Sequence, residues 1–171
     1  MPETVEQYKQ RIMGHIAGQD PIKIQSTTAA RIAKLLKGAP KPRLMKRPAP
    51  GKWSVVEILA HIADTEIVAG YRMRSILGAP GSPIPAFDQD RWAEAESYGK
   101  QDPQKSLEVY RTVREANLRL MKSLKPEQWK QFGIHSERGE ESVERLLHMM
   151  AGHDLNHLGQ IEAILAPKKK K

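Results

Sequence analysis

The sequence predicts an all-α protein, a four-helix bundle of up-down-down-up topology with a long connection between helices 2 and 3. Four long segments carry apolar residues at the spacing of a helix face, and little of the chain alternates with a period of two, so we expect no sheet. Residues 78–101 separate the second long helix from the third, and a connection of this length allows two consecutive helices to run in the same direction.

The N-terminal part contains two segments with helical spacing. Residues 3–17 and 28–37 each place their apolar side chains on one side, and Gly18 and Asp20-Pro21 interrupt the pattern between them. The pattern leaves open whether these segments form two helices or one broken helix.

The second long helix has a clear start signal. After a proline-rich loop over residues 39–52, Ser54 and Glu57 match a capping box, in which the Ser hydroxyl and the Glu carboxylate bond exposed backbone N–H groups. The helix is predicted to run to about Leu77, where glycine and proline follow.

The third and fourth long helices are also bounded by local signals. Asp102-Pro103 supplies an N-cap and a proline at the first helical position, and Lys125-Pro126 ends the same helix. A turn-rich link over residues 126–140 leads to the last helix, which is predicted to begin near Glu141 and to end before Pro167.

Length and composition indicate one soluble domain. The chain has 171 residues, and we expect residues 1–167 to form a single helical bundle domain, with residues 1–20 as an N-terminal extension or part of a broken first helix. No run of 18 apolar residues occurs and the first 25 residues lack the apolar core of a signal peptide, so a membrane partner is not expected. Because cysteine is absent, disulfides and thiolate metal ligands are excluded, and we expect the cytoplasm as the compartment.

The basic charge of the chain comes in large part from its C-terminus. The formal net charge is +8, and four of these charges belong to Lys168–Lys171; without them, 24 basic and 20 acidic residues give +4. The lysine run is typical of a disordered, solvated tail. No zinc-finger or RRM-like pattern accompanies it, which argues against a nucleic-acid partner.

Three of the six histidines are candidate metal ligands. His153 and His157 are four residues apart, which places them about 40° apart on one helix face, and they continue an apolar stripe that faces the bundle interior. Such a pair also occurs on ordinary helices, so it needs a third ligand to indicate a metal. His61 lies on the inward face of its own helix, between Ile58 and Thr65. Antiparallel second and fourth helices bring His61 to a similar height, about 10 Å from its helix start.

The other three histidines are not expected at this site. His148 points about 140° away from His153, and His15 and His135 are predicted to lie at the surface.

Three segments form an ordered set of motifs: Pro50–Ser54 (PGKWS), Ile58–Glu66 (ILAHIADTE) and Ala151–Glu162 (AGHDLNHLGQIE). Together they resemble the DinB-like (DinB/YfiT-like) metalloenzyme family, and Phe87–Trp92 (FDQDRW) is similar to a loop of one branch of that family. The resemblance implies an up-down-down-up bundle, often a homodimer. It also implies one divalent ion, usually zinc or nickel, with His61, His153 and His157 as its three ligands.

The resemblance leaves the reaction open. Family members of known activity include S-transferases and isomerases that use a diffusible low-molecular-weight thiol, and many members have no known reaction. Three imidazoles leave an open metal position, where a divalent ion can lower the pKa of water to about 7 or bind a thiol. We therefore expect a metal-dependent S-transferase or hydrolase acting on a small-molecule substrate; the alternative is a non-catalytic metal-binding stress-response protein.

Further candidates surround the predicted ligands. Asp64 is the candidate general base, with a solvated helix carboxylate as the alternative interpretation, and Arg72 and Arg74 are candidates for holding an anionic substrate. The candidate hydrogen-bond partners of the ligands are Asp64, Glu66, Asp154, Asn156 and Gln160, and the residues that would cover a pocket are Asp88, Asp90, Arg91 and Trp92.

Overall fold

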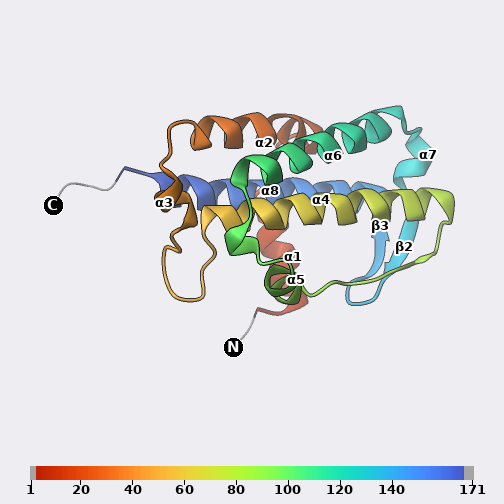
Figure 1. Cartoon of the computed structure of the whole chain (residues 1–171). Helices are drawn as coiled ribbons and strands as arrows, with labels where there is room; N and C mark the ends of the chain where they lie inside the picture. The colour runs from red at the N-terminus through yellow and green to blue at the C-terminus, as the bar shows by residue number, and fades with distance from the viewer. Residues whose placement is uncertain (1–2, 168–171) are drawn as a thin grey trace.

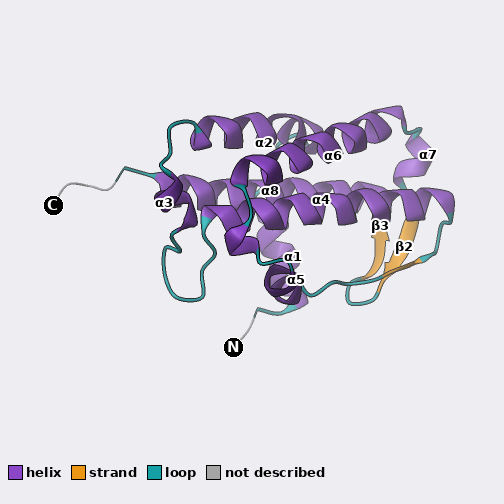
Figure 2. Ribbon diagram, viewed as in Figure 1, coloured by secondary structure: helices purple, strands orange, loops and turns teal. Residues whose placement is uncertain are grey.

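A computed structural model describes residues 3–167, so the predicted lysine tail lies outside the described residues. Most of the described chain is helical (Figure 2). The elements are α1 (Val5–Gly14), α2 (Pro21–Leu36), α3 (Lys41–Met45), α4 (Val55–Gly78), β1 (Pro83–Ile84), α5 (Gln89–Ala95), the 3₁₀ helix η1 (Tyr98–Lys100), α6 (Pro103–Ser123), α7 (Pro126–Trp129), β2 (Phe132–His135), β3 (Gly139–Ser142) and α8 (Val143–Leu165).

The four long helices α2, α4, α6 and α8 form the bundle. Helix α4 packs against α6 and α8, and α2 packs against the same two helices from the other side. The colour gradient in Figure 1 shows that α4 and α6 run in one direction while α2 and α8 run in the other. The predicted up-down-down-up bundle is therefore confirmed, and α4 and α8 are antiparallel.

Helix ends agree with their local signals, with one start earlier than predicted. The capping box forms at α4: Ser54 Oγ accepts from Glu57 N at 3.3 Å, and Ser54 N donates to Glu57 Oε2 at 2.8 Å. Helix α2 begins at Pro21 instead of residue 28, because Asp20 caps it by accepting from Ile22 N at 2.8 Å. The N-terminal part is thus two separate helices.

The expectation that the chain has no sheet was wrong. Strand β1 pairs in parallel with β2, and β2 pairs antiparallel with β3. These strands have only two to four residues, too few for a period to show. In β2, Gly133 and His135 are buried while Phe132 and Ile134 are 36 % and 43 % exposed, so the hydrophobic alternation is the reverse of the usual one. Because β3 includes Glu141 and Ser142, α8 begins at Val143.

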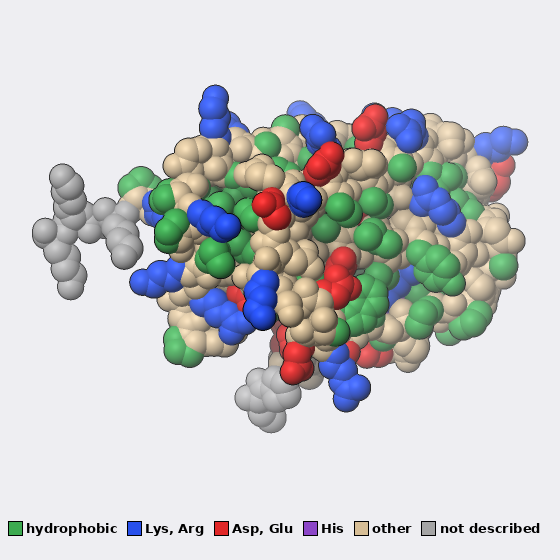
Figure 3. Space-filling model, in the orientation of Figure 1, with side chains coloured by type: hydrophobic (Ala, Val, Ile, Leu, Met, Phe, Trp, Pro, Cys, Tyr) green, Lys and Arg blue, Asp and Glu red, His purple; other side chains and the backbone are tan. Residues whose placement is uncertain are grey.

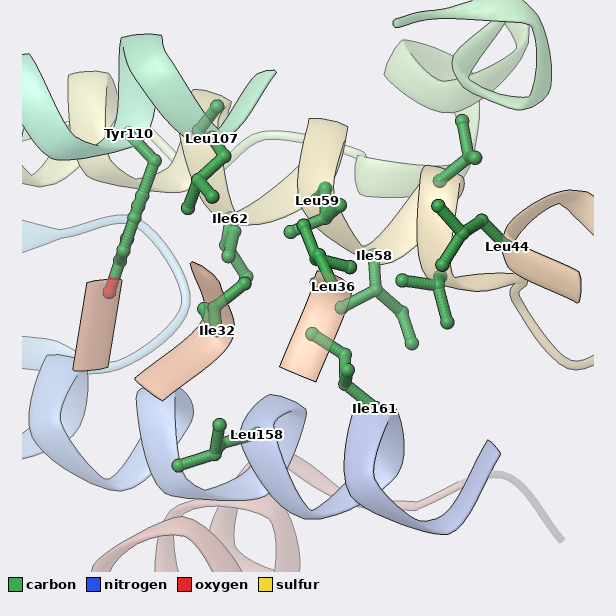
Figure 4. Packing of buried hydrophobic residues seen from close by; sticks show 13 residues of the cluster. Ile32, Leu36, Leu44, Ile58, Leu59, Ile62, Leu107, Tyr110, Leu158 and Ile161 are labelled. Atoms are coloured by element: carbon green, nitrogen blue, oxygen red, sulfur yellow. The ribbon is translucent and has the colours of Figure 1, made fainter. Parts of the chain in front are cut away.

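Among the residues that the structure describes, the apolar core has two large clusters along the bundle with a polar layer between them, and a small third cluster of Ile16, Ile24 and Ala151. Figure 4 shows the first cluster, where Ile58 and Ile62 of α4 meet Leu158 and Ile161 of α8. The second lies farther along α4 and includes Ala69, Met73 and Ile76. Burial of each large aliphatic side chain stabilises the fold by roughly 1.5–3 kcal/mol.

A buried ion-pair network occupies the layer between the clusters. Arg114 of α6 donates to Glu66 of α4 and to Asp154 of α8, both at 2.6 Å, and all three side chains are almost fully buried. Tyr110 Oη donates to Asp154 at 2.9 Å, and Asn117 Nδ2 donates to Glu66 at 2.8 Å. Because removing one partner would leave a buried unpaired charge, the network favours one relative register of the three helices.

The outer surface is mixed in charge. On the face shown in Figure 3, Lys and Arg side chains are interspersed with Asp and Glu, and no histidine is visible. None of the helices in residues 3–167 has the length and hydropathy needed to span a bilayer.

Candidate metal centre

The structure brings the three predicted histidines together inside the bundle. Nε2 of His153 lies 3.0 Å from Nε2 of His61 and 3.1 Å from Nε2 of His157. One ring nitrogen from each of the three residues lies within 4.8 Å of the others. The side chains are buried, with exposed fractions of 2 % for His61 and 7 % for each of the other two.

Helix geometry and a close helix contact produce this convergence. His153 and His157 stand one turn apart on α8, and the antiparallel packing of α4 places His61 opposite them. Helix α1 lies against the same part of α8 because residue 152 is glycine: a Cβ there would lie 2.2 Å from the carbonyl oxygen of Ile12. The first helix therefore packs on α8 directly beside His153.

Burial keeps the three imidazoles neutral. It lowers the pKa of His61 to about 3, an effect to which a charged His157 adds. It lowers the pKa of His157 to about 4, although the hydrogen bond that His157 donates to Gln160 acts in the opposite direction. The pKa of His153 falls well below 6.5, first through burial and then through the neighbouring histidines. Neutral imidazole is the form that binds metal ions.

The hydrogen bond at the other ring nitrogen of His157 shows which of its nitrogens presents a lone pair. His157 Nδ1 lies 2.8 Å from Gln160 Oε1, an acceptor, so Nδ1 carries the hydrogen and Nε2 presents a lone pair. Nδ1 of His61 and of His153 are buried without a hydrogen-bond partner in residues 3–167. Gln160 is thus the one predicted partner that contacts a histidine ring among the bonds of the described chain.

The donor set fits a divalent ion of the zinc type. Neighbouring Nε2 atoms are separated by 3.0 and 3.1 Å. Two nitrogens bound to one tetrahedral zinc ion at about 2.0–2.1 Å would be about 3.3 Å apart. The convergent nitrogens are close to this separation, and within residues 3–167 no carboxylate joins the group, so a bound ion would keep an open position.

Two cavities reach the histidines. The first, of about 380 Å³, is lined by His61 and His153, with Thr65 and Arg72 farther along α4. The second, of about 810 Å³, is lined by His153 and His157. Tyr8 of α1 and Gln89 of α5 line both cavities, a feature that sequence patterns did not indicate for either residue.

Thr65 and Trp53 are further neighbours of the site that the sequence reasoning missed. The Thr65 hydroxyl donates to the His61 carbonyl at 2.8 Å, and its oxygen lies 3.5 Å from His61 Nε2. Its hydrogen is therefore engaged, and its lone pairs are available to a group bound beside His61. The Trp53 ring centroid lies 4.8 Å from that of His61.

The structure does not bring Asp64 to the histidines. Its carboxylate accepts a hydrogen bond from Tyr98 Oη, and it lines neither cavity. Burial raises the pKa of Asp64, and the Tyr98 bond opposes that rise.

The other predicted partners of the ligands have different contacts. Glu66 and Asp154 bind Arg114, and Asn156 Oδ1 accepts from Arg11 at 2.9 Å. Of the predicted pocket-covering loop, Asp88 lines the first cavity and Asp90 the second, whereas Arg91 and Trp92 line neither.

The prediction that His135 lies at the surface was wrong. His135 is 2 % exposed on β2, because it occupies an inward position of a strand that the sequence did not reveal. His15 is exposed as expected, and His148 Nδ1 lies 2.8 Å from the Glu144 carbonyl of its own helix.

Comparison with known proteins agrees with this architecture. The sequence model of the DinB superfamily matches residues 26–161. An Oceanobacillus iheyensis protein named "Putative metal-dependent hydrolase OB0413" is 26 % identical over 140 residues, which cover 82 % of this chain and 80 % of the relative. A Halalkalibacterium halodurans protein named "Putative metal-dependent hydrolase BH0277" is 22 % identical over 148 residues, 86 % of each chain.

A solved structure shows the same fold. YfiT from Bacillus subtilis, described as a probable metal-dependent hydrolase with an unusual four-helix bundle topology, superposes with a TM-score of 0.76. The match covers 94 % of this chain and 88 % of that chain at 18 % identity.

Proposed function

The chain belongs to the DinB superfamily, and from this membership and the geometry of the buried histidines we propose that it is a metal-dependent hydrolase of small molecules. In this proposal, Nε2 of His61, His153 and His157 hold one divalent ion, with zinc as the ion that best fits the donor set. The relatives named as metal-dependent hydrolases support the reaction class.

One observation carries the proposal: three buried, neutral imidazoles direct nitrogens at one point, and two cavities open beside that point. A structural zinc site is closed by four protein ligands, whereas a catalytic site keeps a position for water or substrate. When bound there, a divalent ion supplies a Lewis acid and lowers the pKa of water at the open position to about 7.

Residues of the chain itself prepare the site for hydrolysis. Gln160 fixes the His157 tautomer that leaves Nε2 unprotonated. Thr65 presents a hydroxyl oxygen beside His61 that can accept a hydrogen bond from water in the first cavity. Helix α1, held close to α8 at Gly152, contributes Tyr8 to the lining of both cavities.

The proposal is tested by metal-dependent turnover. Protein stripped with a chelator and reloaded with zinc or nickel is assayed with 4-nitrophenyl esters and anilides, and in parallel with an electrophile plus a small thiol. We expect zinc-dependent ester or anilide hydrolysis that falls to the metal-free level in His153→Ala and persists in His148→Ala. Turnover only in the presence of the thiol would overturn the hydrolase in favour of an S-transferase, and metal binding without either activity would leave a non-catalytic metal-binding protein.

We also propose a homodimer, which rests on the family resemblance. Sedimentation of purified protein across micromolar concentrations is expected to show a species of twice 19.3 kDa. A monomer at all concentrations would contradict it.

A further inference from the structure

Arg72 is a buried cation without a carboxylate partner. It is 7 % exposed, and its Nη2 donates to the Pro85 carbonyl at 2.6 Å. Its Nε is buried with no hydrogen-bond partner, and no carboxylate oxygen in residues 3–167 lies within 4.0 Å of its guanidinium nitrogens. Arg114, the other deeply buried arginine, has two carboxylate partners at 2.6 Å. The neighbours of Arg72 are neutral, namely the Pro85 carbonyl and the Phe87 ring, whose centroid lies 5.8 Å from Cζ. A buried charge without an opposite charge is costly, so an anion bound at Arg72 would be stabilised.

Arg72 lies on the same cavity as two of the candidate metal ligands. Arg72 lines the cavity of about 380 Å³ that also reaches His61 and His153. It follows His61 by eleven residues on α4, so the two lie about 20° apart on the helix face and about 16 Å apart along the axis. The cavity therefore has the histidines at one end and Arg72 at the other.

A second buried donor without a hydrogen-bond partner in residues 3–167 lies near Arg72, on a residue that lines neither cavity. His135 Nδ1 accepts from Glu137 N at 3.1 Å, so the hydrogen of a neutral ring is on Nε2, which is buried without a partner in the described chain. His135 pairs with Ile84 across β1 and β2, and Ile84 precedes the residue whose carbonyl receives Arg72.

None of the neighbouring carboxylates in the described chain neutralises Arg72. Arg138 pairs with Glu141, Glu3 pairs with Arg11, and the Asp88 side chain caps the start of α5. Glu137 also lines the cavity, but it is exposed to solvent and makes no ion pair within 4.0 Å in the described chain. Arg74, the other predicted anion-binding residue, donates to the Gly70 carbonyl at 2.8 Å and to Asn117 Oδ1 at 2.7 Å and lies outside both cavities.

We propose that Arg72 binds a carboxylate of the substrate and thereby selects small anionic molecules that carry the hydrolysable bond several carbon atoms away. This inference rests on the proposed function. A planar carboxylate matches the fork of N–H groups on a guanidinium and brings one negative charge for one unpaired cation, whereas a phosphate group carries closer to two. The cavity volume is within the range of small-molecule sites.

Binding to metal-free protein tests Arg72 separately from catalysis. Hexanoate and 1-hexanol are titrated into chelator-treated protein and followed by NMR. Hexanoate is expected to bind wild type and Arg74→Gln alike, and at least about tenfold more weakly to Arg72→Gln, while hexanol binding stays the same. Arg72→Lys keeps the charge but not the fork and should lie between the two, which gives a readout if Arg72→Gln does not fold.

The zinc-loaded protein provides the second measurement. We expect kcat/KM for 4-nitrophenyl hydrogen adipate to exceed that for 4-nitrophenyl hexanoate, and the preference to be lost in Arg72→Gln mainly through KM. If wild type hydrolyses neither ester, the proposed function fails, while the hexanoate titration still decides the role of Arg72. Equal hexanoate binding by wild type and a folded Arg72→Gln, or tighter Arg72-dependent binding of butyl phosphate than of hexanoate, would overturn the carboxylate assignment.

Discussion

At the scale of single residues, the same side chain has different roles because its surroundings differ. His61, His153 and His157 are neutral and convergent, His135 is buried alone in a strand, and His148 bonds its own helix backbone. Sequence spacing distinguished the first three from the rest. Both helices that carry them are amphipathic, so the spacing of apolar residues indicates which face of each helix points inward.

The three convergent histidines should bind metal as a unit. In a titration of metal-free protein with zinc, His61→Ala or His153→Ala is expected to weaken binding by at least about 100-fold, because only two of the three imidazole ligands remain. His148→Ala is the matched control on the same helix and should bind as wild type does. Equal zinc affinity in wild type and His153→Ala would mean that the three histidines are core residues only.

His135 should make the protein acid-sensitive. Its pKa is lowered to about 4 by burial, then by the charges of Arg138 and Arg72, with Glu141 opposing. Because the unfolded chain binds this proton near pH 6.5 and the folded protein does not, stability is present above pH 6.5 and is lost as the pH falls toward 4. Urea unfolding at pH 7, 5.5 and 4.5 should show a smaller loss in His135→Gln, by up to roughly 3 kcal/mol.

An exposed histidine provides the comparison for this measurement. His15→Gln is the same substitution at an exposed position, so it shows how far a change from histidine to glutamine by itself alters the unfolding curves. A His135→Gln variant with the same pH dependence as wild type would show that His135 titrates normally in the fold.

At the scale of elements, short-range signals set the helix ends and one glycine sets how closely two helices approach. Asp20, Ser54, Asp102 and Ser142 each cap the helix that follows. Gly152 has no such local role; it is required because α1 crosses α8 at that point.

Replacing Gly152 by alanine should displace α1. The new Cβ would lie 2.2 Å from the Ile12 carbonyl oxygen, and since backbone cannot yield cheaply, we expect a loss of about 1–3 kcal/mol in the free energy of unfolding. Gly159→Ala, on the same helix with no atom within 4 Å of its Cβ position, should instead raise stability by up to about 1 kcal/mol. Urea unfolding of both variants makes the comparison, and equal effects would contradict the close contact.

At the scale of the whole molecule, the candidate metal centre joins residues from the two halves of the chain. His61 comes from the middle of the sequence and His153 and His157 from its last helix, so a bound ion would crosslink α4 and α8. An ion that binds only the folded protein stabilises it by mass action.

Zinc should therefore raise the melting temperature. At a free concentration 100 times Kd the gain is about 2.7 kcal/mol, which for a chain of this size corresponds to roughly 5–10 °C. Thermal unfolding with and without a chelator measures the shift, and His153→Ala should show none. A wild-type melting temperature that does not respond to zinc would contradict the crosslink.

The sequence by itself determined the four long helices, the caps at Ser54 and Asp102 and the set of candidate ligands, because helical periodicity and capping depend on residues within a few positions of one another. The long connection and the height of His61 also predicted the antiparallel pairing of α4 with α8.

Only the tertiary structure decided which polar residues serve the site. In the fold, Asp64 accepts a hydrogen bond from Tyr98, and Glu66 and Asp154 bind Arg114. His135 is buried in a strand, and Arg72, not Arg74, lines the first cavity. Each outcome depends on a partner from a distant part of the chain. Strand pairing and buried ion pairs arise between such segments, so neighbouring residues in the sequence contain no signal for them.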